Sequence, residues 1–452
     1  MALYEVLQNI MCFSLILRAK IINPELQAAP PRYRVAMIAT KAPSEPLDVL
    51  QKTLTAMLNQ DYPYPYDVWL ADERPDDETR AWCAEQGIRI STRAGAAEYH
   101  QPQWPRRTRC KEGNLAYFYD KHGYDEYEVV AQFDADHVPS PSYLSSVTPA
   151  FLDPQIGYAA CPSICGANAD ASWAVRGRLY EEAYFHGAWG ASLARDFLPC
   201  CIGSHYVVRT AALKQIGGIG PELDEDMSTS YIMAANGFKG AFGLNTIANG
   251  DGPVNFEDAM RQDYQWTRSA MIIFCRYLYP WWGREYKLNM LERFGWLRPV
   301  DPPAYWVAWE MVLHKCLKPY WILMGAIHGL LGGLFGVHFD IKVTPKGDRG
   351  QSLMGLRCVA PMLLSSAFGF ALAAFVAPAA GVAYLSALWL LGGAGAVLAA
   401  VVVALHYAEN HSLQSLPWDN LAVHATAQLA ALTLGGFAVL SKGWGDWGLL
   451  VQ

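Results

Sequence analysis

The sequence predicts an α/β domain with a mostly parallel, doubly wound sheet, joined to an α-helical transmembrane bundle. Three observations lead to this prediction. Short apolar strands alternate with helical segments over residues 31–256, which is the pattern of a sheet covered by helices on both faces. Carboxylates recur directly after these strands. Beyond about residue 319, acidic residues become rare and long apolar runs begin.

The strands of the predicted sheet are short, apolar and rich in β-branched residues. We expect them at 35–39, 68–71, 88–91, 129–133, 157–160 and 206–208. Helices are expected at 47–59, at 111–121 and around Tyr180 and Tyr231. Another helix is expected after the strand at 68–71, and it extends through Trp82. Ligands of such a sheet bind outside the carboxyl ends of its strands. Asp72, Asp134 and Asp136 should therefore converge at one edge.

Four apolar runs in the C-terminal part each approach the ~20 residues that span a bilayer. They are Tyr320–Phe339, Cys358–Ala377, Val382–Leu405 and Leu421–Leu440. A buried core helix would explain one such run but hardly four. We therefore expect an integral membrane protein, with transmembrane helices within 319–452 and interfacial helices within 257–318.

The N-terminal residues 1–30 predict a short amphipathic or membrane-associated helix. Their apolar stretch, Val6–Leu17, contains polar residues and lacks a basic start and a small-residue cleavage site, so it does not match a signal peptide. Basic residues follow it at Arg18, Lys20, Arg32 and Arg34. The positive-inside rule then places the domain 31–256 on the cytoplasmic side of the membrane.

Composition narrows the function classes. The net charge is −7 and no basic stripe is present, which argues against a nucleic-acid partner. The ten cysteines show no C-x-x-C spacing, so neither a zinc site nor a disulfide framework is expected. This cysteine usage is typical of a reducing cytosol.

Asp134 and Asp136 end the strand at 129–133, with one small residue between them. Side chains alternate along an extended chain, so both carboxylates can face the same ligand. Hard oxygen ligands suit Mg²⁺ or Mn²⁺ that carries a substrate diphosphate. A solvated loop start would contain the same residues, so the assignment depends on the rest of the chain.

Further motifs follow in a fixed order. They are Thr40 with Glu45, Asp72-Glu73, Lys111-Glu112-Gly113-Asn114, Cys200-Cys201-Ile202-Gly203-Ser204, Leu223-Asp224-Glu225-Asp226, Gln262-Asp263-Tyr264-Gln265-Trp266 and Ile341-Lys342-Val343-Thr344-Pro345-Lys346-Gly347. In this order, over residues 35–347, the chain resembles the processive family 2 glycosyltransferases, which include cellulose, hyaluronan, chitin and curdlan synthases. The resemblance implies a GT-A-like catalytic domain.

The resemblance also implies a donor site for a UDP-sugar. Its residues would be Thr40, Glu45, Asp72, Lys111, Asp134, Asp136 and Lys346. Lys111 would meet the diphosphate as a point charge, and Gly113 would let the backbone approach it. Asp134 and Asp136 correspond to the metal-binding DxD motif. The loop at 341–350 resembles the gating loop of cellulose synthases, which closes over the nucleotide; a basic cytosolic loop between helices would have a similar composition.

By the same match, an acceptor sugar would be bound by Gly203, Ser204, Glu225, Gln262, Trp266 and Arg268. Asp226 would be the general base that takes the proton of the acceptor hydroxyl. One base and one attack predict inversion, so an α-linked donor would give a β-linked product. Taken alone, the acids at 224–226 would be read as helix capping.

The chain departs from the family pattern at Gln265, where the family has arginine. Glutamine cannot supply positive charge to a diphosphate, and Arg268 or Arg261 could substitute from nearby. Trp266 is retained and can stack on the face of a sugar.

The leading prediction is a membrane-embedded, metal-dependent, inverting glycosyltransferase. It would use a UDP-sugar, with UDP-glucose first, to extend a β-linked glucan and move it across the bilayer. Export or regulatory subunits are further candidate partners. One alternative is a non-processive transferase to a lipid carrier. Another is a transporter or channel with a nucleotide-sensing domain, which would need ionisable residues deep within the spans. From Cys358 onward, the spans contain almost no ionisable residue apart from His424, which argues against this alternative. A non-catalytic relative would have lost Asp136 or Asp226, and both are present in this chain.

Overall fold

The computed structural model describes residues 17, 29–43, 45–183, 186–187, 190–194, 199–221, 224–273, 275–276, 318–337, 339, 353–375, 382–411 and 415–447. Three predicted features lie outside the described residues. They are the N-terminal helix within 1–28 (residue 17 excepted), most of the interfacial segment 274–317, and the loop at 341–350 with Lys346.

A seven-stranded sheet forms the centre of the α/β part, in the order β3-β2-β1-β4-β8-β6-β9. Its strands are β1 (Val35–Lys41), β2 (Tyr66–Asp72), β3 (Arg89–Ser91), β4 (Val129–Asp134), β6 (Ile156–Ala160), β8 (His205–Arg209) and β9 (Lys239–Phe242). Strand β8 runs antiparallel to β4 and β6, and the other neighbours are parallel. The predicted mostly parallel sheet is confirmed, with one antiparallel strand.

A second, three-stranded sheet has the order β5-β10-β7. Its strands are β5 (Val138–Pro139), β7 (Ser163–Ile164) and β10 (Ala248–Asn249). Strands of two residues are too short to show a hydrophobic period, and this sheet was not predicted. Because β5 follows Asp136 almost directly, the small sheet ties the end of β4 to segments from much later in the chain.

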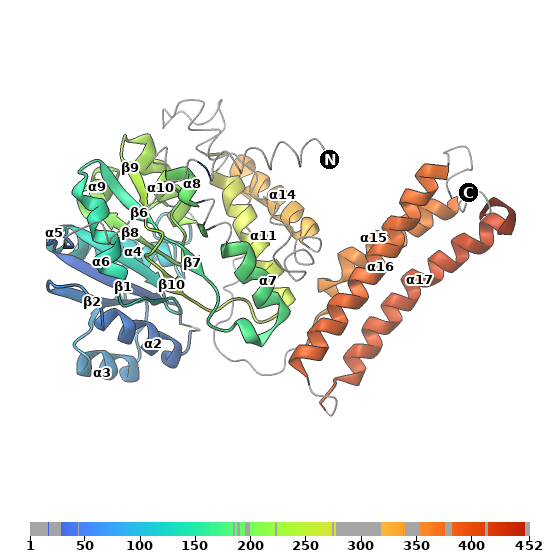
Figure 1. Ribbon diagram of the computed structural model, residues 1–452, viewed down its shortest axis with the longest axis horizontal. Helices are drawn as coiled ribbons and strands as arrows, with labels where there is room; N and C mark the ends of the chain where they lie inside the picture. The colour runs from blue at the N-terminus through green and yellow to red at the C-terminus, as the bar shows by residue number, and fades with distance from the viewer. Residues whose placement is uncertain are drawn as a thin grey trace.

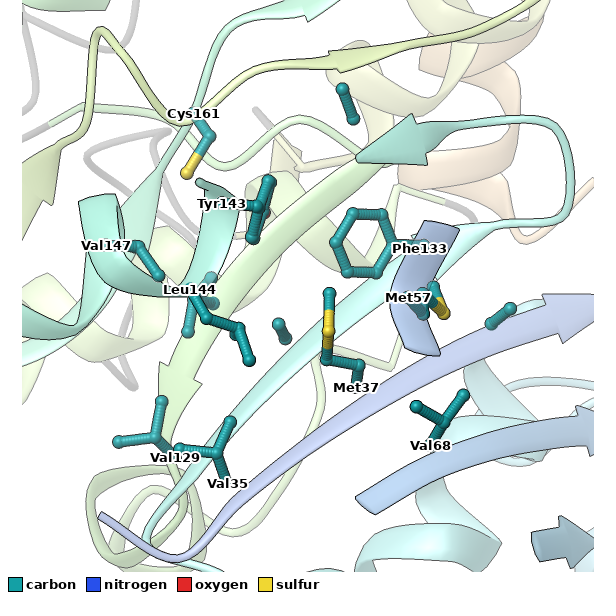
Figure 2. Close-up of a cluster of buried hydrophobic side chains, with 14 of the residues drawn as sticks. Val35, Met37, Met57, Val68, Val129, Phe133, Tyr143, Leu144, Val147 and Cys161 are labelled. Atoms are coloured by element: carbon teal, nitrogen blue, oxygen red, sulfur yellow. The ribbon is translucent and has the colours of Figure 1, made fainter. Parts of the chain in front are cut away.

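Both faces of the large sheet are buried. Along β1, Val35 and Met37 pack into one core cluster, whereas Ala36 and Ile38 pack into another, as expected when successive side chains point to opposite faces. Figure 2 shows the first cluster, where β1, β2 and β4 meet α2 (Leu47–Leu58) and α6 (Tyr143–Val147). The opposite face is covered by α4 (Lys111–Phe118), α9 (Thr210–Gln215) and α10 (Glu225–Ala235).

The remaining helices connect and extend this core. Within the α/β part they are α3 (Asp77–Glu85), η2 (Ala97–Tyr99), η3 (Tyr119–Gly123), α5 (Tyr124–Glu126), η4 (Thr148–Leu152), η5 (Ala169–Ala171), α7 (Trp173–Glu182) and α8 (Gly190–Leu193). Asp76 caps α3 by accepting the Thr79 N–H at 2.7 Å, and Ser172 caps α7 in the same way through Val175. The predicted helix at 111–121 is α4 followed by the π-helical turn η3.

The C-terminal part is helical, as predicted. It contains α11 (Phe256–Ile273), α14 (Pro319–Phe335), η9 (Leu356–Cys358), α15 (Ala360–Phe375), α16 (Val382–Asn410) and α17 (Trp418–Trp447). Each of the four apolar runs therefore contains one of the helices α14 to α17. Among the described residues, one stretch, Ala387–Glu409, is both long and apolar enough to cross a membrane, whereas the apolar parts of α14 and α15 are shorter.

The long helices lie beside the α/β part. Figure 1 shows α15, α16 and α17 grouped together, with α7, α11 and α14 between them and the sheet. One core cluster joins these groups: Trp173 of α7 and Phe256 of α11 belong to it together with Met362, Val402 and Ala431 of the long helices. Helix α7 thus lies where the sheet domain meets the C-terminal helices.

Candidate active site

The carboxyl ends of β2, β1 and β4 lie in a row at one edge of the sheet. Thr40 of β1 pairs with Asp134 of β4, and Lys41 pairs with Asp72 of β2. Strand β1 therefore separates Asp72 from Asp134 by two strand spacings, about 10 Å. Asp134 and Asp136 meet as expected, but Asp72 does not join them.

Asp72 is held inside the protein. Its carboxylate has no exposed surface, lies 3.4 Å from Lys41 Nζ and accepts the Arg74 N–H at 2.8 Å. A buried carboxylate is stabilised by such a cation and hydrogen bond. Asp72 thus fixes the ends of β1 and β2, and its contact with a nucleotide remains a prediction.

Thr40 and Glu45 also bond to the protein at the end of β1. The Thr40 hydroxyl donates to the Phe133 carbonyl at 3.2 Å, and the Glu45 carboxylate accepts the Ala42 N–H at 2.6 Å. Both side chains therefore shape the loop after β1, next to Asp134. Their contact with a nucleotide remains a prediction.

Lys111, the first residue of α4, links two of the predicted motifs. Its Nζ lies 2.7 Å from Asp134 Oδ1 and 3.7 Å from Glu225 Oε1, and it donates to the Gly203 carbonyl. Burial lowers the pKa of the Lys111 ammonium, but the neighbouring Asp134 and Glu225 carboxylates outweigh this effect and raise it. Lys111 is therefore a charged bridge between the DxD motif and the acids at the start of α10.

Packing explains why the Lys-x-Gly-Asn segment has a glycine at position 113. A Cβ on Gly113 would overlap the guanidinium of Arg93. Arg93 is buried, binds Glu73 at 3.1 Å and donates to the Tyr99 carbonyl at 2.6 Å. Glycine at this position thus makes room for an arginine that holds Glu73, and the approach of a diphosphate to the Gly113 backbone remains a prediction.

Gly203 and Ser204 lie between the DxD strand and the predicted base. The Asp134 N–H donates to the Ser204 carbonyl at 2.8 Å. A Cβ on Gly203 would lie only 3.1 Å from Asp226 Oδ2, so a residue without a side chain lets this segment approach the carboxylate closely. The structure therefore brings Lys111, Asp134, Gly203, Glu225 and Asp226 together.

The three acids at 224–226 lie at the N-terminal end of α10. Burial raises the pKa of all three, to about 8 for Glu225 and about 6 for Asp226. At Asp226 the backbone N–H of Met227 and the charge of Lys111 oppose this rise. Of these two groups, Asp226 has the lower pKa and therefore ionises more readily, as a general base must.

A candidate metal centre lies at the end of β4. The ligand atoms of Asp134, Asp136 and His137 are all within 4.8 Å of one another. His137 Nδ1 lies 3.2 Å from Asp136 Oδ1, and its Nε2 lies 3.2 Å from Ser163 Oγ. Two carboxylates and an imidazole form a donor set that fits Mn²⁺ or Mg²⁺. Sequence reasoning missed His137, although it directly follows the DxD motif.

The predicted acceptor residues Gln262, Trp266 and Arg268 lie on α11. Trp266 is 43% exposed, whereas Arg268 is buried with its guanidinium 5.7 Å from the Tyr264 ring. Burial raises the pKa of Asp224, and Ser269 and Arg268 of α11 oppose this rise. Helix α11 therefore packs against the acid segment that contains Asp226.

A family model described as "Glycosyltransferase like family 2" matches residues 30–269, more than half of the chain. The chain belongs to this glycosyltransferase family. The matched range contains β1 to β10 and most of α11, and thus every predicted site residue except Lys346. The protein is accordingly a glycosyltransferase, and its catalytic domain has the GT-A-like α/β fold with a mostly parallel sheet.

Curated relatives of this glycosyltransferase include two bacterial proteins named cellulose synthase catalytic subunit (UDP-forming). The one from Xanthomonas axonopodis pv. citri is 29% identical over 259 residues, 54% of this chain and 32% of the relative. The one from Pseudomonas fluorescens is 26% identical over 244 residues, 51% of this chain and 30% of the relative. The matches thus span about a third of each relative's length.

Among solved structures, the glycosyltransferase is similar to a mannosyltransferase from Pyrobaculum calidifontis in complex with GDP-Man and Mn²⁺. The two chains are 15% identical, with a TM-score of 0.44, and the match covers 88% of this chain and 96% of the other. A second similar structure is glucosyl-3-phosphoglycerate synthase from Mycobacterium tuberculosis with Mn²⁺ and UDP, at 14% identity and a TM-score of 0.31, covering 48% and 69% of the two chains.

Proposed function

We propose that this chain is a membrane-embedded, inverting glycosyltransferase that uses UDP-glucose to extend a β-linked glucan. The observation that carries the proposal is the meeting of Asp134, Lys111 and Asp226, which come from β4, α4 and α10. A donor site and a base next to each other are what a single displacement on a nucleotide sugar requires.

In the proposed reaction, Asp226 accepts the proton of an acceptor hydroxyl. The oxygen of that hydroxyl bonds to the anomeric carbon of the donor while the bond from this carbon to the diphosphate oxygen breaks, so UDP leaves with the bonding electrons. Attack from the face opposite the leaving group inverts the anomeric centre. Gly203 lies directly beside this carboxylate, because a Cβ at this position would come within 3.1 Å of Asp226 Oδ2.

Asp134, Asp136 and His137 would hold the divalent cation, Mg²⁺ or Mn²⁺, as these residues fit it in donor type and spacing. When bound, the cation supplies positive charge that stabilises the departing diphosphate. Lys111 adds a fixed cation next to Asp134, and its charge lowers the pKa of Asp226.

The choice of donor and product rests on the relatives. Two curated relatives are named UDP-forming cellulose synthase subunits, which supports UDP-glucose as donor and a β-glucan as product. We further propose that 31–256 is the cytosolic catalytic domain, that 257–318 lies at the membrane interface, and that 319–452 spans the membrane, with the loop 341–350 and Lys346 closing over the nucleotide. The apolar helix Ala387–Glu409 supports membrane insertion.

Membranes containing the protein provide the test. They would be incubated with radiolabelled UDP-glucose, UDP-N-acetylglucosamine, UDP-galactose or GDP-mannose, one at a time, with Mg²⁺ or Mn²⁺. We expect label in an insoluble β-linked glucan with UDP-glucose only. Incorporation of a single sugar into a lipid extract would instead identify a non-processive transferase, and no incorporation from any donor would refute the proposed activity.

A further inference from the structure

Trp266 stacks against an arginine that does not belong to its own helix. The guanidinium carbon of Arg178, on α7, lies 4.6 Å from the centre of the Trp266 ring. A guanidinium at this distance is attracted to the face of an indole and holds it in place. The sequence motif around Trp266 has Gln265 where the family has arginine, so the cation at this tryptophan comes from another part of the chain.

Arg178 is held firmly to α11. Its Nη1 and Nη2 each donate to Asp263 Oδ1 at 3.1 Å, and Nη2 also donates to the Ala259 carbonyl at 3.2 Å. The carboxylates of Glu181 and Glu182 lie 3.7 Å and 4.0 Å from the guanidinium, whose side chain is only 2% exposed. Asp263 and Trp266 are one helical turn apart, so they share a side of α11.

The two arginines that the sequence offered as substitutes have other contacts. Arg261 binds Asp258 at 2.7 Å and Glu257 at 2.9 Å. Arg268 is buried and lies near the Tyr264 ring. Among the described residues, the one cation found over the Trp266 ring is Arg178.

The position of the cation determines which surface of the indole a ligand can use. One face of the ring is covered by Arg178, yet 43% of Trp266 remains exposed. Ser269, one turn further along the same side of α11, faces Asp224, two residues before the proposed base. Trp266 thus keeps an exposed surface on the side of α11 that also contains Ser269.

We propose that Arg178 is a positioning residue for the acceptor platform. It fixes Trp266 so that the exposed part of the indole stacks on the acceptor sugar. This inference rests on the proposed function, because it assumes a carbohydrate acceptor. A ring that is already ordered loses less conformational freedom when a sugar binds.

The test combines kinetics with chemical modification of Trp266. Purified full-length Arg178→Gln would be assayed with UDP-glucose and a soluble cello-oligosaccharide acceptor. We expect the KM for the acceptor to rise roughly five- to tenfold, with the KM for UDP-glucose unchanged. Arg178→Lys should recover part of the loss, because lysine keeps the charge but not the planar group. Arg261→Gln is the matched control and should leave both constants unchanged.

Two variants guard against a purely structural effect. Arg178→Gln leaves buried carboxylates without their cation. The double variant Arg178→Gln with Asp263→Asn replaces the ion pair by a neutral, hydrogen-bonded pair. This double variant should fold and still show the higher KM for the acceptor. In a Trp266→Ala background, Arg178→Gln should add nothing. Equal changes in both KM values, or an independent effect in that background, would overturn the positioning role.

Oxidation of Trp266 by N-bromosuccinimide, followed by peptide mass spectrometry, separates the two levels of the proposal. Trp266 should be oxidised faster in Arg178→Gln than in the wild type, whether or not a sugar is transferred. An unchanged rate of Trp266 oxidation would overturn the inference about Arg178 alone. Protection of wild-type Trp266 by cello-oligosaccharide is expected if the acceptor is a glucan. Absence of both protection and transfer would overturn the proposed function instead.

Discussion

The Lys111 ammonium lies 2.7 Å from Oδ1 of Asp134, so the cation expected to meet a diphosphate is already bound to the first acid of the DxD motif. The same ammonium reaches the Gly203 carbonyl and approaches Glu225. Lys111 therefore acts on both halves of the site. It balances the charge of Asp134 where a metal would bind, and it lowers the pKa of Asp226 where the acceptor would lose its proton.

The pH dependence of transfer should report the ionisation of Asp226. Burial raises the pKa of Asp226 to about 6, so this carboxyl group keeps its proton to a higher pH than an ordinary aspartate, whose pKa is about 4. A base works only when ionised, and activity should therefore fall as the pH decreases through about 6. The measurement is kcat/KM for UDP-glucose against pH. An acidic limb near 4 would contradict the assignment.

Removing the charge of Lys111 should move that limb. In Lys111→Gln the Asp226 carboxylate loses the cation that opposes its protonation, and we expect the acidic limb to shift upward by about one pH unit. Lys111→Arg keeps the charge and should leave the limb close to the wild-type position. If both variants lower activity equally at every pH, Lys111 has only a structural or donor-binding role.

His137 should be required for activation by metal. Because His137 completes the donor set with Asp134 and Asp136, His137→Ala should raise the Mn²⁺ concentration for half-maximal activity about tenfold or more. Chelation with EDTA should abolish transfer by the wild type, and added Mn²⁺ should restore it. His122→Gln, a change at a histidine paired with Glu126, serves as the control. An unchanged Mn²⁺ requirement in His137→Ala would exclude His137 as a ligand.

Trp266 should matter for elongation more than for activation of the donor. Loss of a stacking ring costs about 0.5–1.5 kcal/mol, so Trp266→Ala should lower transfer to the acceptor roughly three- to tenfold. The release of UDP by hydrolysis without acceptor should change less, because Trp266 is proposed to bind the acceptor and not the donor. Comparing polymer length on gels with UDP release checks both points. Polymers of wild-type length would argue against the stacking role.

Much of the sheet could be predicted from the sequence because its physics is local. Strand β1, for example, begins with the continuous apolar run Val35–Ala39, as expected for a strand buried on both faces, and Asp134 and Asp136 lie at the end of β4. The apolar pattern of a strand does not predict whether the strand runs parallel or antiparallel to its neighbours. The strand at 205–209 has the same apolar pattern whether it runs parallel or antiparallel, and it was found antiparallel to β4.

The candidate site was predicted only as far as motif positions allow. The position of a residue after a strand predicts the edge of the sheet at which the residue lies, but it does not predict the partner of its side chain. Asp72 reached the expected edge, yet it is buried against Lys41. The partnership of Arg178 with Trp266 joins α7 to α11 through tertiary packing, and no local pattern in the sequence encodes it. His137, in contrast, could have been found as a nitrogen donor adjacent to the DxD motif.

Asp226→Asn tests the central claim most directly, with sugar transfer and UDP binding measured on the same preparation. Asparagine keeps the shape of the side chain but cannot accept the proton, so transfer from UDP-glucose should fall by about 10²- to 10⁴-fold. The affinity for UDP in the presence of Mn²⁺ should stay within about twofold, because Asp134, Asp136 and Lys111 are intact. Transfer at the wild-type rate, or an equal loss of UDP binding, would contradict the assignment of Asp226 as the base.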